Sequence, residues 1–210
     1  VSTIAHELGH AIHSYYSNKE QNIIDANYTI MVAEVASTVN EILLSSYQIE
    51  NEKDKYKKAS LIYEMVENIR ATLFRQAMFA EFEKDVHQRI ENNEMLTCDD
   101  LNKIYYNLNK KYFGENIIVD EQIKYEWLRI PHFYTPFYVY KYATGISAAI
   151  IIAKNILDKK EGYKEKYIEM LKQGCTKKVV PLLKMVDVDL EDSRTYENAI
   201  LWMKDLYEKL

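Results

Sequence analysis

Apolar positions recur along the chain at intervals of three and four residues, and no segment shows strict alternation of apolar and polar residues. This spacing is typical of helices that bury one face, whereas half-buried strands require a period of two. The clearest example lies within residues 55–91. Its apolar series includes Ile62, Met65, Ile69, Leu73 and Phe74. The pattern therefore predicts an all-α protein.

Polar connections and capping residues divide the pattern into helices. The predicted helices cover residues 1–17, 28–48, 55–91, 97–113, a short segment around Trp127, 138–157, 163–173 and a last segment after 189. Three side chains are suited to N-cap positions: Asn27, Asp120 and Asp189. Thr97 and Asp100 resemble a capping box, and Gly174 is placed to end the helix before it. Since no flexible linker is visible, we expect one helical unit over residues 1–210.

The composition agrees with a globular helical protein. Apolar residues make up 48% and charged residues 28% of the chain, and only five Gly and three Pro interrupt the helical pattern. The formal charge of −5 argues against a nucleic-acid partner. The longest apolar run, residues 148–153, is too short to span a membrane. Because Cys98 and Cys175 cannot form a disulfide framework, we expect a reduced, cytoplasmic setting.

A metal-binding motif lies on the first predicted helix. His6, Glu7 and His10 fit the pattern H-E-x-x-H. Residues four apart on a helix point about 40° apart and lie one turn along the axis, so two imidazoles can reach one zinc ion. Glu7 projects to the side, where it can take a proton from a water molecule at the metal and deliver it to the leaving amine. The apolar flanks of the motif favour a buried site over two solvated histidines.

A catalytic zinc usually takes three protein ligands and keeps one position open. The candidates for the third ligand are His13, Glu20, Asp25, Glu34 and Glu41. His13 faces the same way as His6 and His10 but lies a further turn along the axis. Because a straight helix cannot wrap three such side chains around one ion, we expect His13 to line the cleft and contact substrate.

Glu34 is the favoured third ligand. It lies far enough beyond His10 for the chain to turn and return on an adjacent helix. Its neighbours with small side chains are Ala33, Ala36 and Ser37. Small residues let two helices approach closely, as a ligand set shared by two helices requires. Glu41 lies on the same helix face and is placed to accept a hydrogen bond from a ligand histidine.

Three segments together resemble oligoendopeptidase F, of the thimet-oligopeptidase family of zinc metallopeptidases. They are HELGHAIHSYY at residues 6–16, AEVAST at 33–38 and IPHFY at 130–134. The resemblance implies a zincin-like helical fold in which the H-E-x-x-H helix packs against a glutamate-bearing helix. It also implies one zinc ion per chain, held by His6, His10 and Glu34, with Glu7 as the catalytic glutamate. The implied substrates are short peptides.

The resemblance also assigns a role to residues 131–136, a loop that would place a histidine and tyrosines over the scissile carbonyl. Negative charge grows on that oxygen when water attacks, and donors already in place stabilise it. We expect His132 to be one donor. Tyr140 is the first choice for a tyrosine donor and Tyr138 the second, while Tyr134 would contact the substrate backbone. The alternative is an aromatic core cluster, because the chain contains 18 tyrosines.

The sequence leaves three hypotheses for function. The first is a zinc endopeptidase that cuts short peptides, and the second is a zinc carboxypeptidase of related helical fold. The third is an inactive fragment that binds metal without turnover. It arises because the resemblance covers only the C-terminal part of the family's chain, so one wall of the substrate channel would be missing. The motif also begins at His6, and a metal site is seldom left unsupported at a chain terminus. We therefore expect residues 1–210 to be the C-terminal catalytic portion of a longer enzyme.

Overall fold

The computed structural model describes residues 2–210, and every regular element in that range is helical. The α-helices are α1 (Ser2–Glu20), α2 (Ile30–Asn51), α3 (Lys55–Ile69), α4 (Arg75–Glu91), α5 (Cys98–Phe113), α6 (Tyr140–Leu157), α7 (Tyr163–Leu171), α8 (Val179–Lys184) and α9 (Ser193–Tyr207). A π-helix, η1 (Arg70–Phe74), and two 3₁₀-helices, η2 (Glu121–Arg129) and η3 (Pro131–Tyr134), complete the set. The prediction of an all-α fold is confirmed; Val1 lies outside the described residues.

The chain forms two compact units. Unit 1 contains residues 2–69 and 144–210, and unit 2 contains residues 70–143. One boundary lies where α3 gives way to η1, and the other lies inside α6. Both boundaries fall within helical segments rather than in linkers. The helical pattern of the sequence indicated a single unit and did not predict this division.

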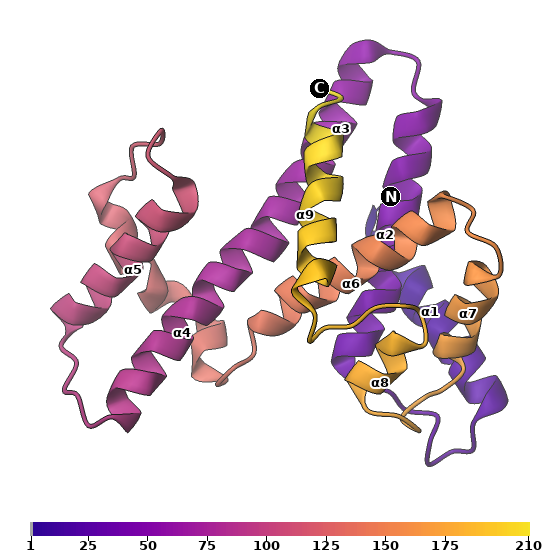
Figure 1. The fold of residues 1–210 in the computed structure, drawn as a ribbon, viewed down its shortest axis with the longest axis horizontal. Coiled ribbons are helices and arrows are strands. Elements are labelled where there is room, and N and C mark those ends of the chain that lie inside the picture. Colours follow the sequence, from indigo (N-terminus) through magenta and orange to yellow (C-terminus); the bar gives the residue numbers. More distant parts are fainter. Residues whose placement is uncertain (1) are drawn as a thin grey trace. The chain divides into compact units, whose positions relative to one another are not determined.

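In unit 1, α1 packs along α2, and α9 lies beside α3 (Figure 1). The contact between α1 and α2 is unusually close at Gly9. A Cβ atom built on Gly9 would lie 2.5 Å from Ser37 Cα and 3.0 Å from the carbonyl oxygen of Ala36. Only a glycine fits at this distance without a shift of backbone. The predicted close approach of α1 and α2 is thus found. Gly9 on α1 contributes to it, as do the small residues Ala36 and Ser37 on α2.

The apolar run on α6 forms a core segment of unit 1. Its fully buried members are Ala148, Ala149, Ile150, Ile152 and Ala153. A helix that is apolar on several faces must be covered on several sides. Among residues 2–210, every helix falls short of the length or the hydropathy that crossing a bilayer requires.

Unit 2 has an aromatic core of its own. Residues from α4, α5 and the segment around η2 and η3 supply its buried members: Met78, Phe79, Phe82, Tyr105, Leu108, Ile130 and Val139. The polar tips of large side chains in this core are satisfied. The Tyr105 hydroxyl donates to Glu126 Oε2 at 2.8 Å, and the indole N–H of Trp127 donates to Asn102 Oδ1 at 2.9 Å. This core supports the loop between η3 and α6.

The predicted helix starts are correct where a local hydrogen bond defines them. Thr97 and Asp100 form the predicted capping box of α5, with both reciprocal bonds present. Asp120 caps the helix that contains Trp127, accepting from Gln122 N at 2.7 Å, although this helix is 3₁₀ rather than α. A cap that bonds to its own chain within a few residues is readable from local sequence.

Two predicted N-caps are wrong. The residue before α2 is Thr29 rather than Asn27, and its backbone is extended, with φ −71° and ψ 148°. The last helix is capped by Asp192, which accepts from Arg194 N at 3.0 Å, and not by Asp189. Asp189 instead accepts from Glu191 N at 3.0 Å in the preceding turn. Two aspartates in one short segment are equally suited to capping, and only the backbone conformation distinguishes them.

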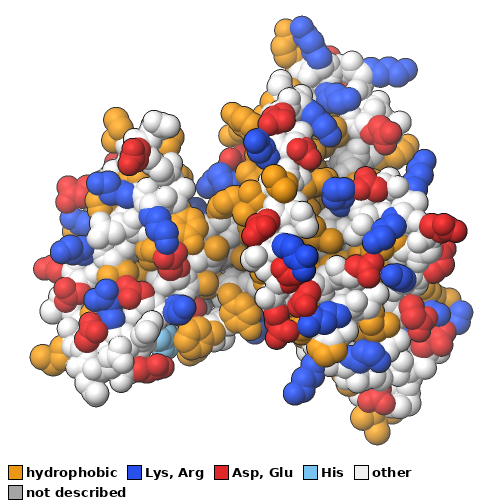
Figure 2. Space-filling model, in the orientation of Figure 1, with side chains coloured by type: hydrophobic (Ala, Val, Ile, Leu, Met, Phe, Trp, Pro, Cys, Tyr) orange, Lys and Arg blue, Asp and Glu red, His pale blue; other side chains and the backbone are white. Residues whose placement is uncertain are grey.

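The charged surface is mixed in sign. On the face shown in Figure 2, Lys and Arg side chains alternate with Asp and Glu side chains over most of the surface. Both cysteines are exposed free thiols. Neither observation points to a further functional site.

Candidate functional site

Two histidines of α1 and a glutamate of α2 bring their donor atoms together. His6 Nε2 lies 3.1 Å from His10 Nε2, 3.6 Å separate His6 Nε2 from Glu34 Oε2, and 3.9 Å separate His10 Nε2 from Glu34 Oε1. The three side chains are partly buried, and they form the one group of at least three potential metal ligands found among residues 2–210. Glu34 can approach His6 and His10 because α1 and α2 pack closely together at Gly9.

These separations fit a zinc ion. Bonds of about 2.0–2.1 Å in tetrahedral geometry place neighbouring donor atoms roughly 3.3–3.4 Å apart. The three measured separations lie on both sides of that value, so small side-chain rotations suffice to bring all donors to one ion. Two imidazoles and a carboxylate are also a typical ligand set of catalytic zinc sites that keep one position open.

Glu41 contacts His6 on the side of the ring that faces away from His10 and Glu34. Its Oε1 lies 3.2 Å from His6 Nδ1, while the other ring nitrogen of His6 faces His10 and Glu34. A carboxylate at Nδ1 fixes the tautomer that leaves Nε2 free to bind metal. Glu41 also accepts from Ser2 Oγ at 3.4 Å. The predicted contact of Glu41 with a histidine of the motif is therefore found.

The other candidates for third ligand lie elsewhere. Glu20 is 4.0 Å from Lys172 Nζ, and Asp25 accepts from Asn22 Nδ2 at 2.7 Å. Glu7 is exposed on α1 and does not belong to the group of converging donors. The role of Glu7 as the catalytic glutamate stays a prediction.

His13 departs from its predicted role. Its side chain is fully buried, and its ring stacks on Tyr28 with centroids 3.6 Å apart. Neither ring nitrogen has a hydrogen-bond partner among the described residues. Burial, with a smaller contribution from His10, lowers the pKa of His13 from 6.5 to about 4. A buried neutral ring does not line an open cleft, so we correct the expectation that His13 contacts substrate.

Tyr28 is a supporting residue that the sequence analysis missed. Its hydroxyl is 2.6 Å from Ser14 Oγ and 3.5 Å from the carbonyl oxygen of His10. Together with its stacking on His13, these contacts tie the end of the loop before α2 to the metal-binding helix. Tyr28 stands in a polar connection, and no spacing rule marks it.

In unit 2, His132 lies among tyrosines. Its Nε2 is 3.2 Å from the hydroxyl of Tyr142, and the ring of Tyr138 stacks on it with centroids 5.6 Å apart. The rings of Tyr138 and Tyr142 also contact each other edge to face. Tyr142 was absent from the predicted site although it lies four residues after Tyr138, one helical turn further on. The structure thus groups His132 with Tyr138 and Tyr142.

The two remaining tyrosines of the prediction are exposed to different degrees. Tyr140 opens α6 with 44% of its surface exposed, and Tyr134 on η3 has 84% exposed. Of the two, Tyr134 exposes the larger fraction of its surface. The assignment of Tyr134 to substrate binding stays a prediction, as does the choice among the tyrosine donors.

A buried carboxylate holds the loop that leads to Tyr138. Glu83 Oε1 accepts the backbone N–H of Phe137 at 2.6 Å. Phe137 has φ +54°, a left-handed conformation that bulky residues seldom adopt. Because such a conformation persists only when its surroundings enforce it, the contact with Glu83 fixes the backbone directly before Tyr138.

The metal-binding group belongs to unit 1 and the His132 group to unit 2. The contacts described above for each group lie within its own unit. The prediction that both act on one carbonyl group stays a prediction.

Comparison with known proteins places this arrangement in a family. The chain matches the profile of peptidase family M3 over residues 1–201. It is 42% identical to Oligopeptidase PepF of Bacillus subtilis over 208 residues, which is 99% of this chain and 31% of the relative. The chain thus spans about a third of the length of that relative.

Two solved structures resemble this chain along its whole length. A crystal structure of a candidate peptidase from Chlamydophila abortus has a TM-score of 0.95 at 39% identity, covering 100% of this chain and 35% of that one. The crystal structure of oligoendopeptidase-F from Enterococcus faecium has a TM-score of 0.83 at 36% identity, covering 100% of this chain and 39% of that one. The profile match spans nearly all of the sequence, and the chain therefore belongs to peptidase family M3.

Proposed function

We propose that this protein is a zinc-dependent peptidase that hydrolyses short peptides. The observation that carries the proposal is the convergence of His6, His10 and Glu34 at distances suited to zinc. Membership of peptidase family M3 supports the same conclusion, because it makes peptide hydrolysis the expected chemistry for an open metal site.

The chain's own residues have distinct tasks in this proposal. His6, His10 and Glu34 would hold the zinc, and Glu41 would keep His6 in the binding tautomer. A bound zinc ion acidifies water and polarises a carbonyl group. Glu7 takes the proton of the attacking water and passes it to the amine that leaves.

His132 and its tyrosines would stabilise the charge that develops on the carbonyl oxygen. The His132 ring and the hydroxyl groups of Tyr138, Tyr142 and Tyr140 are donors that could be oriented before the reaction begins. The contact of Tyr142 with His132 makes Tyr142 a stronger candidate than the sequence indicated. Tyr134 would bind the substrate backbone.

We infer cleavage at internal bonds of short peptides as the principal mode. The name of the Enterococcus faecium structure, an oligoendopeptidase, supports this mode over trimming from the C-terminus. Mass spectrometry of digested peptides separates the two, since an endopeptidase releases two fragments from one internal cut. Products that shorten one residue at a time would instead support a carboxypeptidase.

Metal content and turnover test the function directly. We expect one zinc ion per chain. The Glu7→Gln variant should keep the zinc but no longer cleave peptides. The His10→Ala variant should lose both the zinc and the peptide cleavage. Zinc is measured by plasma emission spectroscopy and cleavage with quenched fluorescent peptides. A protein that binds no zinc at micromolar metal, or a Glu7→Gln variant with full activity, would contradict the proposal.

A further inference from the structure

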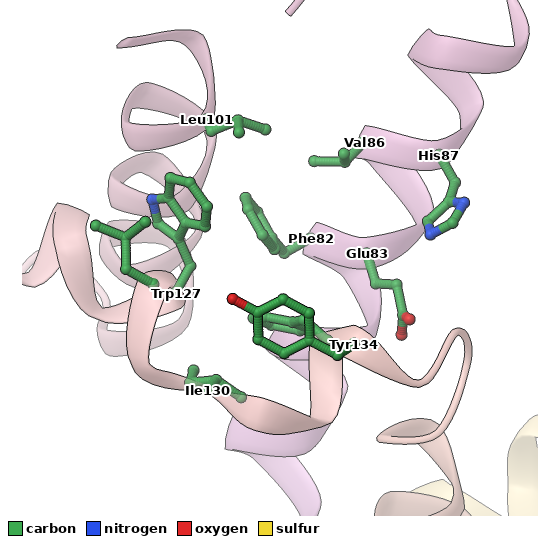
Figure 3. A pocket seen from close by; sticks show the side chains of 10 residues that line it. Phe82, Glu83, Val86, His87, Leu101, Trp127, Ile130 and Tyr134 are labelled. Atoms are coloured by element: carbon green, nitrogen blue, oxygen red, sulfur yellow. The ribbon is translucent and has the colours of Figure 1, made fainter. Parts of the chain in front are cut away.

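A cavity in unit 2 lies between α4, α5 and the 3₁₀-helices η2 and η3 (Figure 3). Phe82 and Val86 of α4 point toward Leu101 of α5 and Trp127 of η2, so most of the wall is apolar (Figure 3). Its volume is ≈ 220 Å³. Small-molecule sites usually measure about 300–1,000 Å³, so this cavity has room for one amino-acid side chain rather than a larger ligand.

Glu83 places a charge in this apolar wall. The residue is 5% exposed, and one carboxylate oxygen accepts the N–H of Phe137. Within residues 70–143 no Lys or Arg pairs with Glu83, and no second donor reaches its carboxylate. A buried carboxylate with a single neutral donor is incompletely compensated, because burial removes water from the charge. The cavity therefore favours a positive group next to Glu83.

The residues at the edge of the cavity favour the same kind of ligand. His87 lies one turn beyond Glu83 on α4, but its ring packs against Phe137 with centroids 4.8 Å apart. Tyr134 lies across the cavity with its ring exposed (Figure 3). Aromatic faces attract cations, so Tyr134 and Trp127 suit a ligand that carries positive charge on an apolar stem.

The cavity adjoins the group proposed to act on the scissile carbonyl. His132 and Tyr134 are on the same 3₁₀ turn, η3, and Glu83 fixes the loop that leads to Tyr138. A peptide bound at His132 would therefore pass within a few residues of the cavity. This continuity favours the substrate peptide as the occupant.

We propose that this cavity is a specificity pocket for a cationic group on an apolar stem of the bound peptide. The stem lies against Phe82, Val86 and Trp127, and the cation contacts Glu83. This inference rests on the proposed function, which supplies the peptide. A Lys or Arg side chain and the α-ammonium group of an apolar N-terminal residue share this chemistry.

Matched peptides test the proposal. An alanine-based peptide carries Lys or norleucine at each position in turn, and the two side chains differ essentially by the ammonium group. Each peptide is prepared with a free and with an acetylated N-terminus. Dissociation constants are measured by fluorescence anisotropy, with the full natural polypeptide loaded with zinc and carrying Glu7→Gln so that peptides stay intact.

We expect Lys to bind about tenfold more tightly than norleucine at one position, as a hydrogen bond to a charged group implies. A preference that depends instead on the free N-terminus identifies the α-ammonium group as the ligand. The Glu83→Gln variant should abolish the preference, since the amide keeps an acceptor for Phe137 N–H but removes the charge. The control Glu81→Gln should keep it, because Glu81 on the same helix pairs with Lys111 at 2.6 Å outside the cavity.

A second variant covers the case in which Glu83→Gln does not fold. His87→Lys places an ammonium group four residues after Glu83, a favourable helical pairing, and should also remove the preference for Lys. Equal binding of Lys and norleucine at every position, with either terminus, would overturn the proposal. A preference that survives in Glu83→Gln, or in His87→Lys, would overturn it too.

The test of the pocket can succeed or fail independently of the test of the proposed function. A protein that prefers Lys through Glu83 but neither holds zinc nor cleaves peptides would retain the pocket and lose the peptidase assignment. A protein that cleaves peptides without a preference for Lys would keep the peptidase assignment and lose the pocket.

Discussion

The donor atoms of His6, His10 and Glu34 approach one another from two helices, and each of these side chains has a distinct environment. His6 is held on its far side by Glu41, whereas Glu34 approaches from α2. In the proposed site, Glu34 would bind the zinc ion, whereas Glu41 would only orient His6. Loss of the ligand should therefore weaken metal binding more than loss of the orienting residue.

Replacing Glu34 should weaken zinc binding more than replacing Glu41. Loss of an outer residue such as Glu41 typically weakens metal affinity about 10–100-fold, so Glu41→Gln should fall in that range. Glu34→Gln removes a ligand and should exceed about 100-fold on the same scale. Competition with a chelating dye measures the affinities. Glu20→Gln is the control, since Glu20 lies near Lys172 instead; equal effects of all three changes would contradict the ligand assignment.

His13 should make the protein less stable in acid. Its pKa is about 4 in the folded chain against 6.5 ordinarily, so the unfolded chain binds the proton first as pH falls. The free energy of unfolding should decrease as pH falls from about 6.5 to 4, by roughly 2–3 kcal/mol in all, because one pKa unit corresponds to about 1.4 kcal/mol.

The comparison with His13→Phe isolates this effect. The variant cannot take up the proton, and no hydrogen bond is lost, because neither ring nitrogen has a partner among the described residues. Urea denaturation of both proteins without metal, between pH 7 and pH 4, gives the difference. Parallel pH profiles for the two would show that His13 does not titrate in this range.

At the scale of helices, the site depends on how closely α1 and α2 approach. Gly9 meets the backbone of Ser37 directly, while Asn40 Nδ2 bonds to the carbonyl oxygen of Ala5 at 3.4 Å. Because His6 and His10 lie on α1 and Glu34 lies on α2, a shift of one helix would change the distances between their donor atoms.

Gly9→Ala should therefore reduce both stability and zinc affinity. The added methyl group would force the helices apart, and overpacking of this kind costs about 1–3 kcal/mol. Gly145→Ala is the matched control, because a Cβ there meets only Val35 Cγ2 at 4.0 Å. That change should leave stability equal or raise it by up to about 1 kcal/mol through helix propensity. Thermal unfolding and zinc titration measure both; a neutral Gly9→Ala would refute the close-packing argument.

At the scale of the molecule, the chain spans about a third of the B. subtilis relative that it matches. Contacts with parts of a peptide far from the cleaved bond help to drive the chemical step. The proposed metal site, by contrast, uses only residues of α1 and α2. The two properties should therefore respond differently when only residues 1–210 are present.

A polypeptide of residues 1–210 should bind one zinc but cleave peptides at least about tenfold more slowly than the Bacillus subtilis relative, since remote binding contacts contribute to kcat. Zinc content and kcat/KM for the same quenched peptide are measured side by side. Equal turnover would remove the hypothesis of an inactive fragment, whereas absence of zinc would count against the site itself.

The local features of this protein could be read from its sequence. Helical periodicity gave the all-α fold, the i, i+4 spacing of His6 and His10 gave the metal motif, and Thr97 with Asp100 gave a helix start. Each of these depends on residues within about one helical turn of one another, where backbone geometry fixes which side chains meet.

Several contacts between distant segments were decided only by the tertiary structure. The burial of His13 under Tyr28, the pairing of Tyr142 with His132 and the cavity around Glu83 do not follow from local spacing. The division into two units was also invisible, because it falls inside continuous helices. Periodicity states which face of a helix is apolar, but the partner that covers that face is chosen by packing across the whole fold.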